Sequence, residues 1–428
     1  MLGIPSKKRM ADTIIYLSYL VSILLIGLLC AILAKRFSIS NVFLLLISGI
    51  LIAHFPLLPR IAFTPLFLES IGIIALVMIV FDACARFKLR EFSDHSTEAV
   101  KLAFIFLFFN LTIMTLATWL LIGFPLNIHF FFVAMIFAAV MSGTSPDVVL
   151  SMFGNNISRA VELLKVESIL NTPFTVLIPF IILDLIINLL QGQGLPAITN
   201  QIGPLLTQVI TGVGTGILIG IIIFKFMSRY YSETLSPLAI IIAALLSYVL
   251  AQQLGGNGVL AVTTLGLFFG SIRIKEKISL MGFSSIFSNA LEILLFVLLG
   301  YIINFPLTFQ FIFKSVILFT IYLAVRYLSV KIALKGTITR SEQWFLTLNV
   351  SKGIPVAVVT FSLSSLTNIA GISELLNYIL VFILYSILLS TITTKYLHPV
   401  QQEKKGIQKR RKAPVTKPKV LKASSHHA

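Results

Sequence analysis

Long apolar runs alternate with short polar segments along almost the whole chain. A helix of about 20 apolar residues is long enough to cross the hydrocarbon core of a bilayer. The polar segments are short, so most neighbouring runs are joined by brief loops. The pattern predicts about thirteen membrane-spanning helices, over roughly residues 13–34, 41–57, 66–85, 98–123, 129–153, 159–190, 203–227, 236–254, 257–272, 283–304, 309–333, 341–367 and 372–396.

The composition agrees with this pattern. The 428 residues are 57% hydrophobic and only 11% charged, and the mean hydropathy is +0.99. A water-soluble fold of this size does not need so much apolar surface. The sequence therefore predicts an all-α polytopic membrane protein, with residues 1–396 forming the transmembrane domain and no soluble enzyme domain.

Basic residues are distributed unevenly between the predicted loops. Loops such as "QGQGLPAITNQIGP" and "LTNIAGIS" contain no Lys or Arg, and Arg60 is the main exception in this set. Basic loops stay in the cytoplasm, which predicts a cytoplasmic C-terminus and, with an odd number of spans, an N-terminus outside the cell membrane. Lys7, Lys8 and Arg9 oppose this orientation. The predicted cytoplasmic set comprises Lys35, Arg36, Arg86, Lys88, Arg90, Arg159, Lys225, Arg229, Arg273, Lys275, Lys277, Lys331, Lys335 and Arg340.

The C-terminal segment, residues 397–428, differs in composition from the rest. The formal net charge of the chain is +17, and about half of it lies in "KKGIQKRRKAPVTKPKVLK". This stretch has few apolar residues, so we expect it to be disordered and to lie on an anionic membrane surface. Contact of this basic segment with an anionic membrane surface accounts for the net positive charge, so the charge does not indicate a nucleic-acid partner.

No arrangement of residues predicts an enzyme or a bound cofactor. The chain has no nucleophile–base set, metal-ligand cluster or phosphate loop, and Cys30 and Cys84 are too few for a cysteine zinc site. The glycines of "TGVGTGILIG", Gly212, Gly216 and Gly220, superficially resemble a dinucleotide loop but lack the strand–turn–helix context. Small residues every four positions indicate close helix packing in lipid instead.

The fifth predicted span is interrupted by polar residues. "FAAVMSGTSPDVVLSMFG" places Gly143, Thr144, Ser145, Pro146 and Asp147 in succession inside an apolar run. Proline removes a backbone donor and clashes with the preceding turn, and glycine weakens a helix. A simple proline kink, satisfied by serine and threonine, is one interpretation. The carboxylate favours another, because an acid at this depth usually marks an ion or proton path.

The twelfth predicted span contains a similar break. "WFLTLNVSKGIPVAVVTFSL" includes Ser351, Lys352, Gly353 and Pro355, again with one charged residue near the middle. Interrupted helices in corresponding positions of two halves point to a transporter site built from an inverted repeat. The two repeats would each consist of three spans, which we call triplets: one over about 98–190 and the other over about 309–396.

Two further buried charges lie within these triplets. Glu167 and Asn171 share one face of the sixth span because they are four residues apart, and Arg326 lies in the eleventh span. A lone carboxylate in hydrocarbon is costly, whereas opposite an arginine it can stay ionised. We expect Glu167 and Arg326 to form a structural buried ion pair; a direct role of Glu167 in transport is the alternative.

These residues resemble the monovalent cation:proton antiporter superfamily, of the sodium/proton exchanger type, and the resemblance covers nearly all the predicted spans. "SGTSPDVVLSMF" resembles the family's broken helix with Ser-Ala-Thr-Asp-Pro, and "VESILNTP" resembles the helix with Glu-Ser-Leu-Leu-Asn-Asp. "RYLSV" and "SKGIPVAVV" resemble the basic eleventh span and the second broken helix.

The resemblance implies a two-domain homodimeric transporter. A core of the spans over about 98–190 and 309–396 would move like an elevator against a scaffold of the spans over about 13–85 and 203–304. The ion site would lie near the bilayer midplane, where the two broken helices cross beside the sixth span.

The chain departs from the family at two site positions. The family's ion-binding aspartate after the asparagine aligns with Thr172, and the aspartate of Thr-Asp-Pro aligns with Ser145. Exchange by competition needs a titrating group, and Asp147 is the substitute that the sequence offers. Asp147 would then carry the exchangeable charge and bind the monovalent cation. Thr144, Ser145, Asn171 and Thr172 would supply neutral oxygens, which can ligate a hard cation. Lys352 would either compete with the cation for Asp147 or neutralise a helix end.

The resulting prediction is secondary exchange of a monovalent cation for protons, with sodium or lithium favoured over potassium. Two alternatives stay open. The first is an uncoupled or channel-like cation pathway, which the missing aspartates motivate. The second is a non-transporting membrane sensor or regulator that keeps the scaffold and uses the basic tail as its contact.

Overall fold

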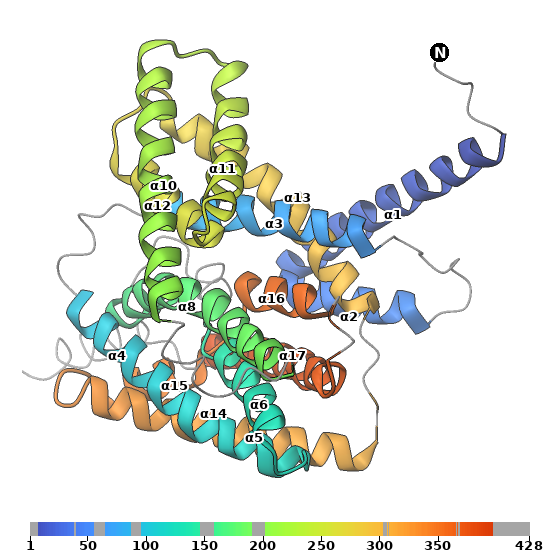
Figure 1. Cartoon of the computed structure of the whole chain (residues 1–428), viewed down its shortest axis with the longest axis vertical. Helices are drawn as coiled ribbons and strands as arrows, with labels where there is room; N and C mark the ends of the chain where they lie inside the picture. The colour runs from blue at the N-terminus through green and yellow to red at the C-terminus, as the bar shows by residue number, and fades with distance from the viewer. Residues whose placement is uncertain are drawn as a thin grey trace, which may run out of the picture.

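The computed structural model describes residues 7–37, 40–54, 65–86, 96–145, 158–190, 202–302, 306, 308–364, 366 and 369–396. In these residues all regular structure is helical (Figure 1). This confirms the predicted all-α fold. Pro146, Asp147 and the basic tail, residues 397–428, lie outside the described residues.

The first group of helices comes from two stretches, residues 7–85 and 202–302. Within it, α13 packs on α2 and α3, and α12 packs on α3, α10 and α11. Its members are α1 (Lys7–Phe37), α2 (Asn41–His54), α3 (Pro65–Ala85), α10 (Ile202–Arg229), α11 (Leu235–Gln253), α12 (Gly258–Ser271) and α13 (Lys277–Ile302).

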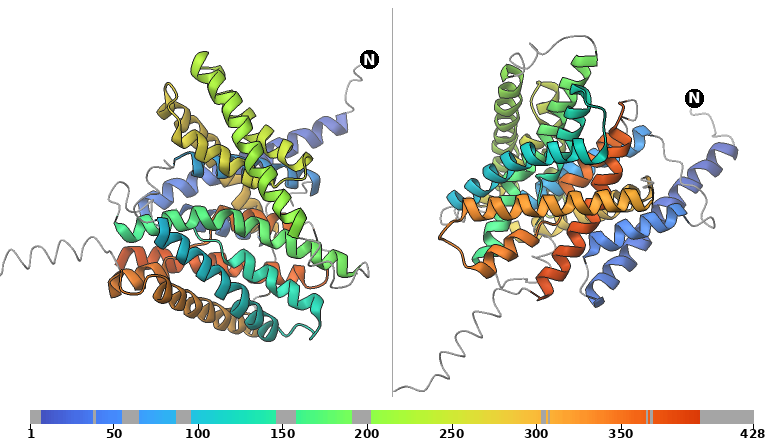
Figure 2. Two further views of the ribbon diagram at one scale, coloured as in Figure 1. Left: turned by 60° about the vertical axis from the view of Figure 1, so that its left-hand side comes forward. Right: turned by 90° about the horizontal axis from the view of Figure 1, so that it is seen from below.

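The second group combines two stretches that are far apart in the sequence. Figure 2 shows α4 beside α14, and α6 packs on α8 and α17. The members are α4 (Ser96–Phe109), the π-helix η2 (Asn110–Met114), α5 (Thr115–Ile122), α6 (Ile128–Met141), α8 (Arg159–Leu190), α14 (Phe309–Ala333), α15 (Arg340–Leu348), α16 (Ile354–Ser364) and α17 (Ile372–Tyr396).

Eight of the described helices are long and apolar enough to cross a membrane. Shorter apolar helices lie inside other predicted spans, at Asn41–Ala53, Ser70–Ala85, Ile128–Met141, Gly258–Ser271 and Pro355–Ser364. The count of about thirteen spans stays a prediction.

Small residues let the helices of the first group approach closely. A Cβ atom on Gly216 would lie 2.3 Å from the carbonyl oxygen of Ala261, and one on Gly300 would lie 2.4 Å from that of Leu46. Both distances are too short for a Cβ atom, so neither position can carry a side chain. At these glycines the backbone of α10 lies directly against that of α12, and the backbone of α13 lies directly against that of α2. The repeat Gly212, Gly216 and Gly220 is therefore a packing surface, as in other membrane helix pairs.

The fourth span differs from the uninterrupted helix expected over residues 98–123. One turn, Asn110–Met114, is a π-helix between α4 and α5. Asn110 is fully buried, and its Nδ2 donates to the carbonyl oxygen of Ala138 in α6 at 2.5 Å. The sequence pattern does not predict this turn, because a π-turn in an apolar run depends on the neighbouring helix rather than on local pattern.

The two groups meet mainly where α16 lies against α3 and α13, and also where α8 contacts α12 and α17 contacts α2. A Cβ atom on Gly72 of α3 would lie 2.9 Å from the Phe361 ring of α16, so the surfaces touch closely at this point.

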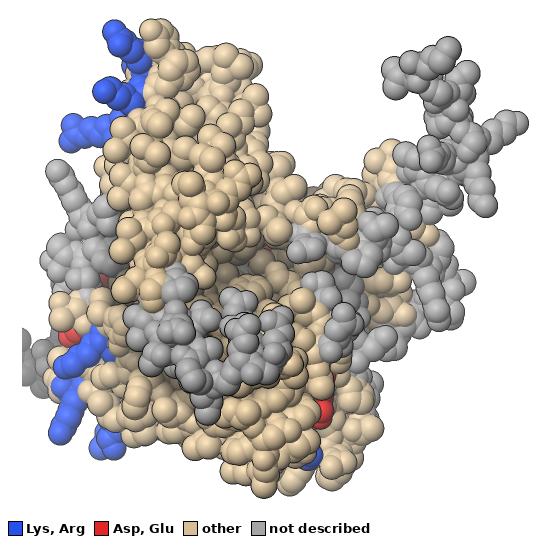
Figure 3. All heavy atoms as spheres, in the orientation of Figure 1, with Lys and Arg blue, Asp and Glu red and all other residues tan. Residues whose placement is uncertain are grey.

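On the face shown in Figure 3, most Lys and Arg side chains gather along the left edge. The described loops and helix ends at 225–229, 273–275 and 331–340 carry exposed basic residues.

Candidate functional site

The first interruption follows α6, whose last turn tightens before the chain leaves the helix. The amide of Ser142 donates to the Ala139 carbonyl at 3.1 Å, and that of Gly143 donates to the Val140 carbonyl at 3.3 Å. These short-range bonds leave the Met141 carbonyl without a partner inside the helix. In the sequence, Pro146 follows Ser145 and disfavours a helical conformation at Ser145, so the helix does not resume before the proline.

The second interruption separates α15 from α16. Asn349 has a buried side chain whose Nδ2 donates to the Phe345 carbonyl at 3.0 Å. Its Oδ1 accepts from Ser390 and Thr394 of α17, both at 2.8 Å. The Lys352 amide donates to Ser386 Oγ at 3.0 Å. Ser386, Ser390 and Thr394 are spaced by four on α17, so one polar helix face satisfies groups that the break exposes.

The two interruptions are joined directly to each other. The amide of Ser145 donates to the Ser351 carbonyl at 2.8 Å, and Ser351 Oγ donates back to the Ser145 carbonyl. A Cβ atom on Gly143 would lie 2.7 Å from Thr175 of α8 and 3.0 Å from Val356 of α16. Glycine is therefore required where the first break passes between these two helices.

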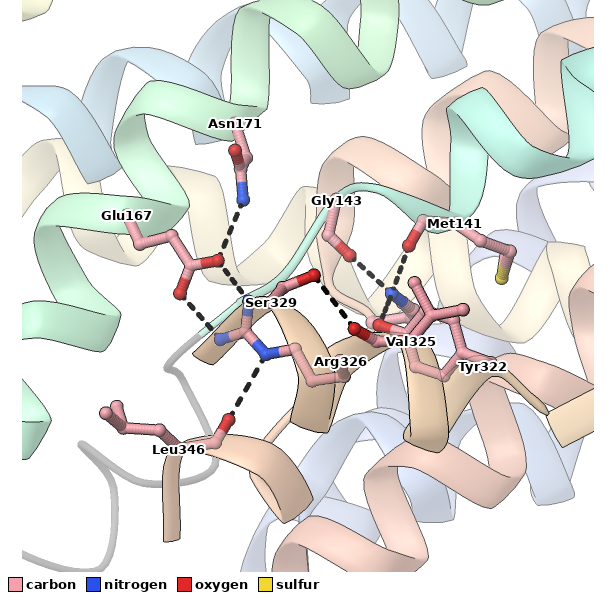
Figure 4. Close-up of polar contacts among 10 residues, drawn as sticks. Met141, Gly143, Glu167, Asn171, Tyr322, Val325, Arg326, Ser329 and Leu346 are labelled. Carbon is pink, nitrogen blue, oxygen red and sulfur yellow. Dashed lines mark hydrogen bonds and ion pairs between the residues drawn. The ribbon is translucent and has the colours of Figure 1, made fainter. Parts of the chain in front are cut away.

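Lys352 lies at this crossing with its ammonium group fully enclosed. Its exposed fraction is 1%, and Nζ donates to the carbonyls of Met141 at 2.6 Å and Gly143 at 2.8 Å. Nζ also donates to the hydroxyl of Tyr322 at 2.6 Å and lies 4.4 Å from the centre of its ring. Figure 4 shows the two carbonyls and the Tyr322 hydroxyl converging on one point. A cation here complements the partial negative charge at the end of α6.

Glu167 and Arg326 are in contact, both with an exposed side-chain fraction of 0% (Figure 4). Arg326 Nη1 donates to Glu167 Oε1, and Nη2 donates to Oε2 at 2.7 Å. Arg326 Nε donates to the Leu346 carbonyl at 3.2 Å, and the guanidinium lies 4.7 Å from the centre of the Phe106 ring. The pair therefore connects α8 with α14, and its arginine also contacts α15 and α4.

The neutral candidate ligands occupy different surroundings. Asn171 is buried, and its Nδ2 donates to Glu167 Oε1 at 3.3 Å. Thr172 is half-buried, and its hydroxyl donates to the Ser168 carbonyl of its own helix at 2.7 Å. Thr144 is buried, and among the described residues its hydroxyl has no hydrogen-bond partner. Ser145, the remaining neutral candidate, is hydrogen-bonded to Ser351 of the second break.

Several residues of this site were missed by the sequence analysis. Tyr322 and Asn349 stand alone in apolar or mixed stretches, and nothing in the local pattern shows that they face a break. The polar stripe on α17 could have been found, because Ser386, Ser390 and Thr394 recur every four residues in an otherwise apolar span.

Comparisons with known proteins agree with this architecture. The family model "Sodium/hydrogen exchanger, transmembrane" matches residues 20–398. The chain is 24% identical over 316 residues to "Probable Na(+)/H(+) antiporter 2" of Methanocaldococcus jannaschii. The aligned region covers 69% of this chain and 71% of that protein.

Solved structures show the same fold. The structure of the sodium proton antiporter MjNhaP1 from Methanocaldococcus jannaschii at pH 8 aligns with a TM-score of 0.74 and 20% identity, covering 90% of this chain and 97% of that one. An electron-microscopy structure of the same antiporter aligns with a TM-score of 0.71 and 21% identity, covering 95% and 99%.

Two interrupted helices that meet inside an all-helical membrane fold define a class of secondary transporters. The match of the family model extends over most of the chain. This chain belongs to the sodium/hydrogen exchanger family, which confirms the resemblance seen in the sequence. The family is one of transporters that exchange a cation for protons, and not one of enzymes.

Proposed function

We propose that this chain exchanges sodium or lithium, in preference to potassium, for protons across the cell membrane. The observation that carries the proposal is the crossing of the two breaks. There, Ser145 and Ser351 are hydrogen-bonded to each other in a buried region. Next to them lies the buried hydroxyl of Thr144, which has no hydrogen-bond partner among the described residues. An unpaired oxygen at such a depth is costly unless something binds it, and a partly dehydrated cation suits it.

The proposed ligands are the oxygens of Thr144, Ser145, Asn171 and Thr172, together with the carboxylate of Asp147. Thr172 donates its hydroxyl proton to Ser168, which leaves the lone pairs of its oxygen able to accept a cation. Asp147 follows Ser145 by two residues in the sequence and would carry the exchangeable charge. Hydroxyls and amides do not titrate near neutral pH, so proton coupling requires an acid or an amine.

Glu167 and Arg326 have a supporting role in this proposal. Their two parallel hydrogen bonds hold α8 beside α14. Asn171 is bound to the same carboxylate, so the pair also fixes the helix face next to the breaks. The ion pair is thus a scaffold for the site and does not itself carry the ion.

Alternating access would come from movement of one helix group against the other. The group with α4 to α8 and α14 to α17 would form the moving core, and the group with α1 to α3 and α10 to α13 the scaffold and homodimer contact. In the described part of the chain, α16 contacts α3 and α13, α8 contacts α12, and α17 contacts α2, so the core would slide against the scaffold along these helices. The exposed basic ends at 225–229, 273–275 and 331–340 would face the cytoplasm, with the C-terminus on that side.

A comparison of cations in proteoliposomes tests this function. With an acidic interior and a pH-sensitive dye inside, addition of external sodium or lithium should raise the internal pH rapidly. Potassium should act more weakly, and choline should give only the rate of protein-free vesicles. Equal responses to all four salts would rule out cation-driven proton exchange.

The uncoupled pathway is a second candidate, favoured by the threonine at position 172 and the serine at position 145, where the family has aspartates. It predicts sodium flux that follows the membrane potential and does not change the internal pH. Sodium-22 uptake with no proton movement in the same vesicles would favour this candidate over exchange.

A further inference from the structure

The carbonyl groups at the end of α6 need donors from outside the regular helix. The last four carbonyls of any helix lack the partners that a continuing helix would give them, and in α6 these run from Ala138 to Met141. The tightened turn satisfies the middle two, and the Met141 carbonyl accepts from Lys352. In a continuing helix the Ser142 amide would donate to the Ala138 carbonyl, but it donates to the Ala139 carbonyl instead. The Ala138 carbonyl therefore needs a donor from another element.

Asn110 of the π-helix η2 supplies this donor. Its side chain is fully buried, and Nδ2 donates to the Ala138 carbonyl at 2.5 Å. Its Oδ1 has no hydrogen-bond partner among the described residues. A buried oxygen without a partner costs free energy, so leucine, which has nearly the same size and no polar side-chain atom, would suit simple helix packing better. The amide donor is therefore the part of this side chain that the structure uses.

The stretch around Asn110 contacts the surroundings of both breaks. The π-helix η2 packs on α6 and on α14. One turn earlier, the Phe106 ring lies 5.9 Å from the Tyr322 ring and 4.7 Å from the Arg326 guanidinium, measured to ring centres. Tyr322 and Arg326 are the α14 residues that bond to the second break and to α15. π-turns are rare and are frequent at functional sites, and this one places an amide donor at the start of the first break.

We propose that Asn110 is a positioning residue for cation binding at the first break. Its amide holds the last turn of α6 in the tightened form, and this form sets where Thr144 and Ser145 lie. The inference rests on the proposed function, because Thr144 and Ser145 are cation ligands only in that proposal. Asn110 acts on them through the backbone of α6.

Loss of the donor changes the path of the chain after α6. The Ala138 carbonyl would regain the Ser142 amide, and the last turn would relax toward a regular α-helix. A 3₁₀ turn rises about 0.5 Å more per residue than an α-helix, so this relaxation would move Thr144 and Ser145 by roughly 1 to 2 Å. The Ser145 amide would then lose the Ser351 carbonyl, to which it donates at 2.8 Å. Ligands must be held within about 0.5 Å of their working positions, so sodium affinity should fall.

The test compares Asn110→Leu with Thr115→Val in proteoliposomes. Thr115 is also buried, and its hydroxyl donates to the Leu111 carbonyl of the same span, so the control removes a hydrogen bond that does not reach the break. Asn110→Leu should raise the sodium concentration for half-maximal exchange at least about tenfold, with the maximal rate within about threefold of wild type. Thr115→Val should keep both quantities within about twofold.

Two further variants separate the donor from the size of the side chain. Asn110→Gln keeps an amide donor, and its half-maximal sodium concentration should lie closer to that of wild type than to that of Asn110→Leu. Asn110→Ser keeps a polar group, but a serine hydroxyl in a helix bonds to a carbonyl of its own preceding turn, so this variant should behave as Asn110→Leu does. Should Asn110→Leu not fold, Asn110→Ser takes its place in the comparison.

Amide hydrogen exchange, resolved to single residues, measures the position of the first break without sodium or transport. The Ser145 amide should exchange at least about tenfold faster in Asn110→Leu than in wild type, since its bond to the Ser351 carbonyl is lost. Thr115→Val should leave this rate unchanged. A wild-type rate at Ser145 in Asn110→Leu would overturn the inference, and so would a wild-type half-maximal sodium concentration.

The outcome for the proposed function is separate. If wild-type protein exchanges sodium for protons and Asn110→Leu has the wild-type half-maximal sodium concentration, only the role of Asn110 is wrong. If wild-type protein moves no protons in response to sodium, the proposed function fails. The inference about cation binding then fails with it, even where the Ser145 amide exchanges faster in Asn110→Leu.

Discussion

Replacing Arg326 by methionine should destabilise the protein by about 3–5 kcal/mol, because it leaves the Glu167 carboxylate buried without a counter-charge. The exposed side-chain fraction of both residues is 0%, so water cannot replace the guanidinium. The Leu346 carbonyl also loses a donor. The loss should appear as a lower midpoint of thermal and denaturant-induced unfolding of the purified protein.

Two controls separate the loss of the pair from the loss of a side chain. The double variant Glu167→Gln with Arg326→Met should be more stable than Arg326→Met alone, since no unpaired charge remains. Arg159→Met breaks a partly exposed pair with Glu98, with exposed side-chain fractions of 36% and 25%, and should cost only about 1 kcal/mol. A loss for Arg326→Met as small as that for Arg159→Met would contradict the structural role.

Replacing Asp147 by asparagine should reduce sodium-driven proton movement by roughly 100-fold or more, since the amide keeps the size of the side chain but neither titrates nor carries charge. The protein should still fold, because an uncharged amide is less costly in the membrane than a carboxylate. The rate of internal alkalinisation in proteoliposomes measures the effect. The thermal midpoint serves as a check on folding.

Asp184→Asn is the matched control for this variant. Asp184 lies thirteen residues beyond Asn171 in the sequence of α8, which places it about 20 Å further along a straight helix. Its replacement should leave the rate within about twofold of wild type. Exchange at the wild-type rate and with the wild-type dependence on pH in Asp147→Asn would move the exchangeable charge to another residue.

The sequence predicts those features in which a helix-breaking or charged residue lies inside an apolar span, because only a few structural environments stabilise such a residue there. Glycine and proline within three residues of each other in an apolar run weaken a helix, and the sequence predicts interruptions around Gly143 and Gly353. A glutamate and an arginine in different apolar spans are costly apart, and the structure brings Glu167 into contact with Arg326.

Other features depend on contacts between helices that no local pattern encodes. The sequence left two roles for Lys352, and the carbonyls it contacts are seen only when α6 and the second break are placed together. Tyr322 became part of the site only because α14 packs beside that crossing. The π-turn at Asn110 likewise accompanies a contact with Ala138. Each of these depends on tertiary packing, which outweighs local preference.

Exchange requires that sodium movement through the protein is coupled to proton movement in the opposite direction. Proteoliposomes with an acidic interior and equal sodium concentrations on both sides test this coupling, with sodium-22 as the tracer. If protons leaving the vesicles drive exchange, sodium-22 should accumulate above its external concentration, and a protonophore that removes the pH gradient should abolish the accumulation. Sodium-22 that only equilibrates, at the same rate with and without the pH gradient, would show that the protein does not couple the two movements.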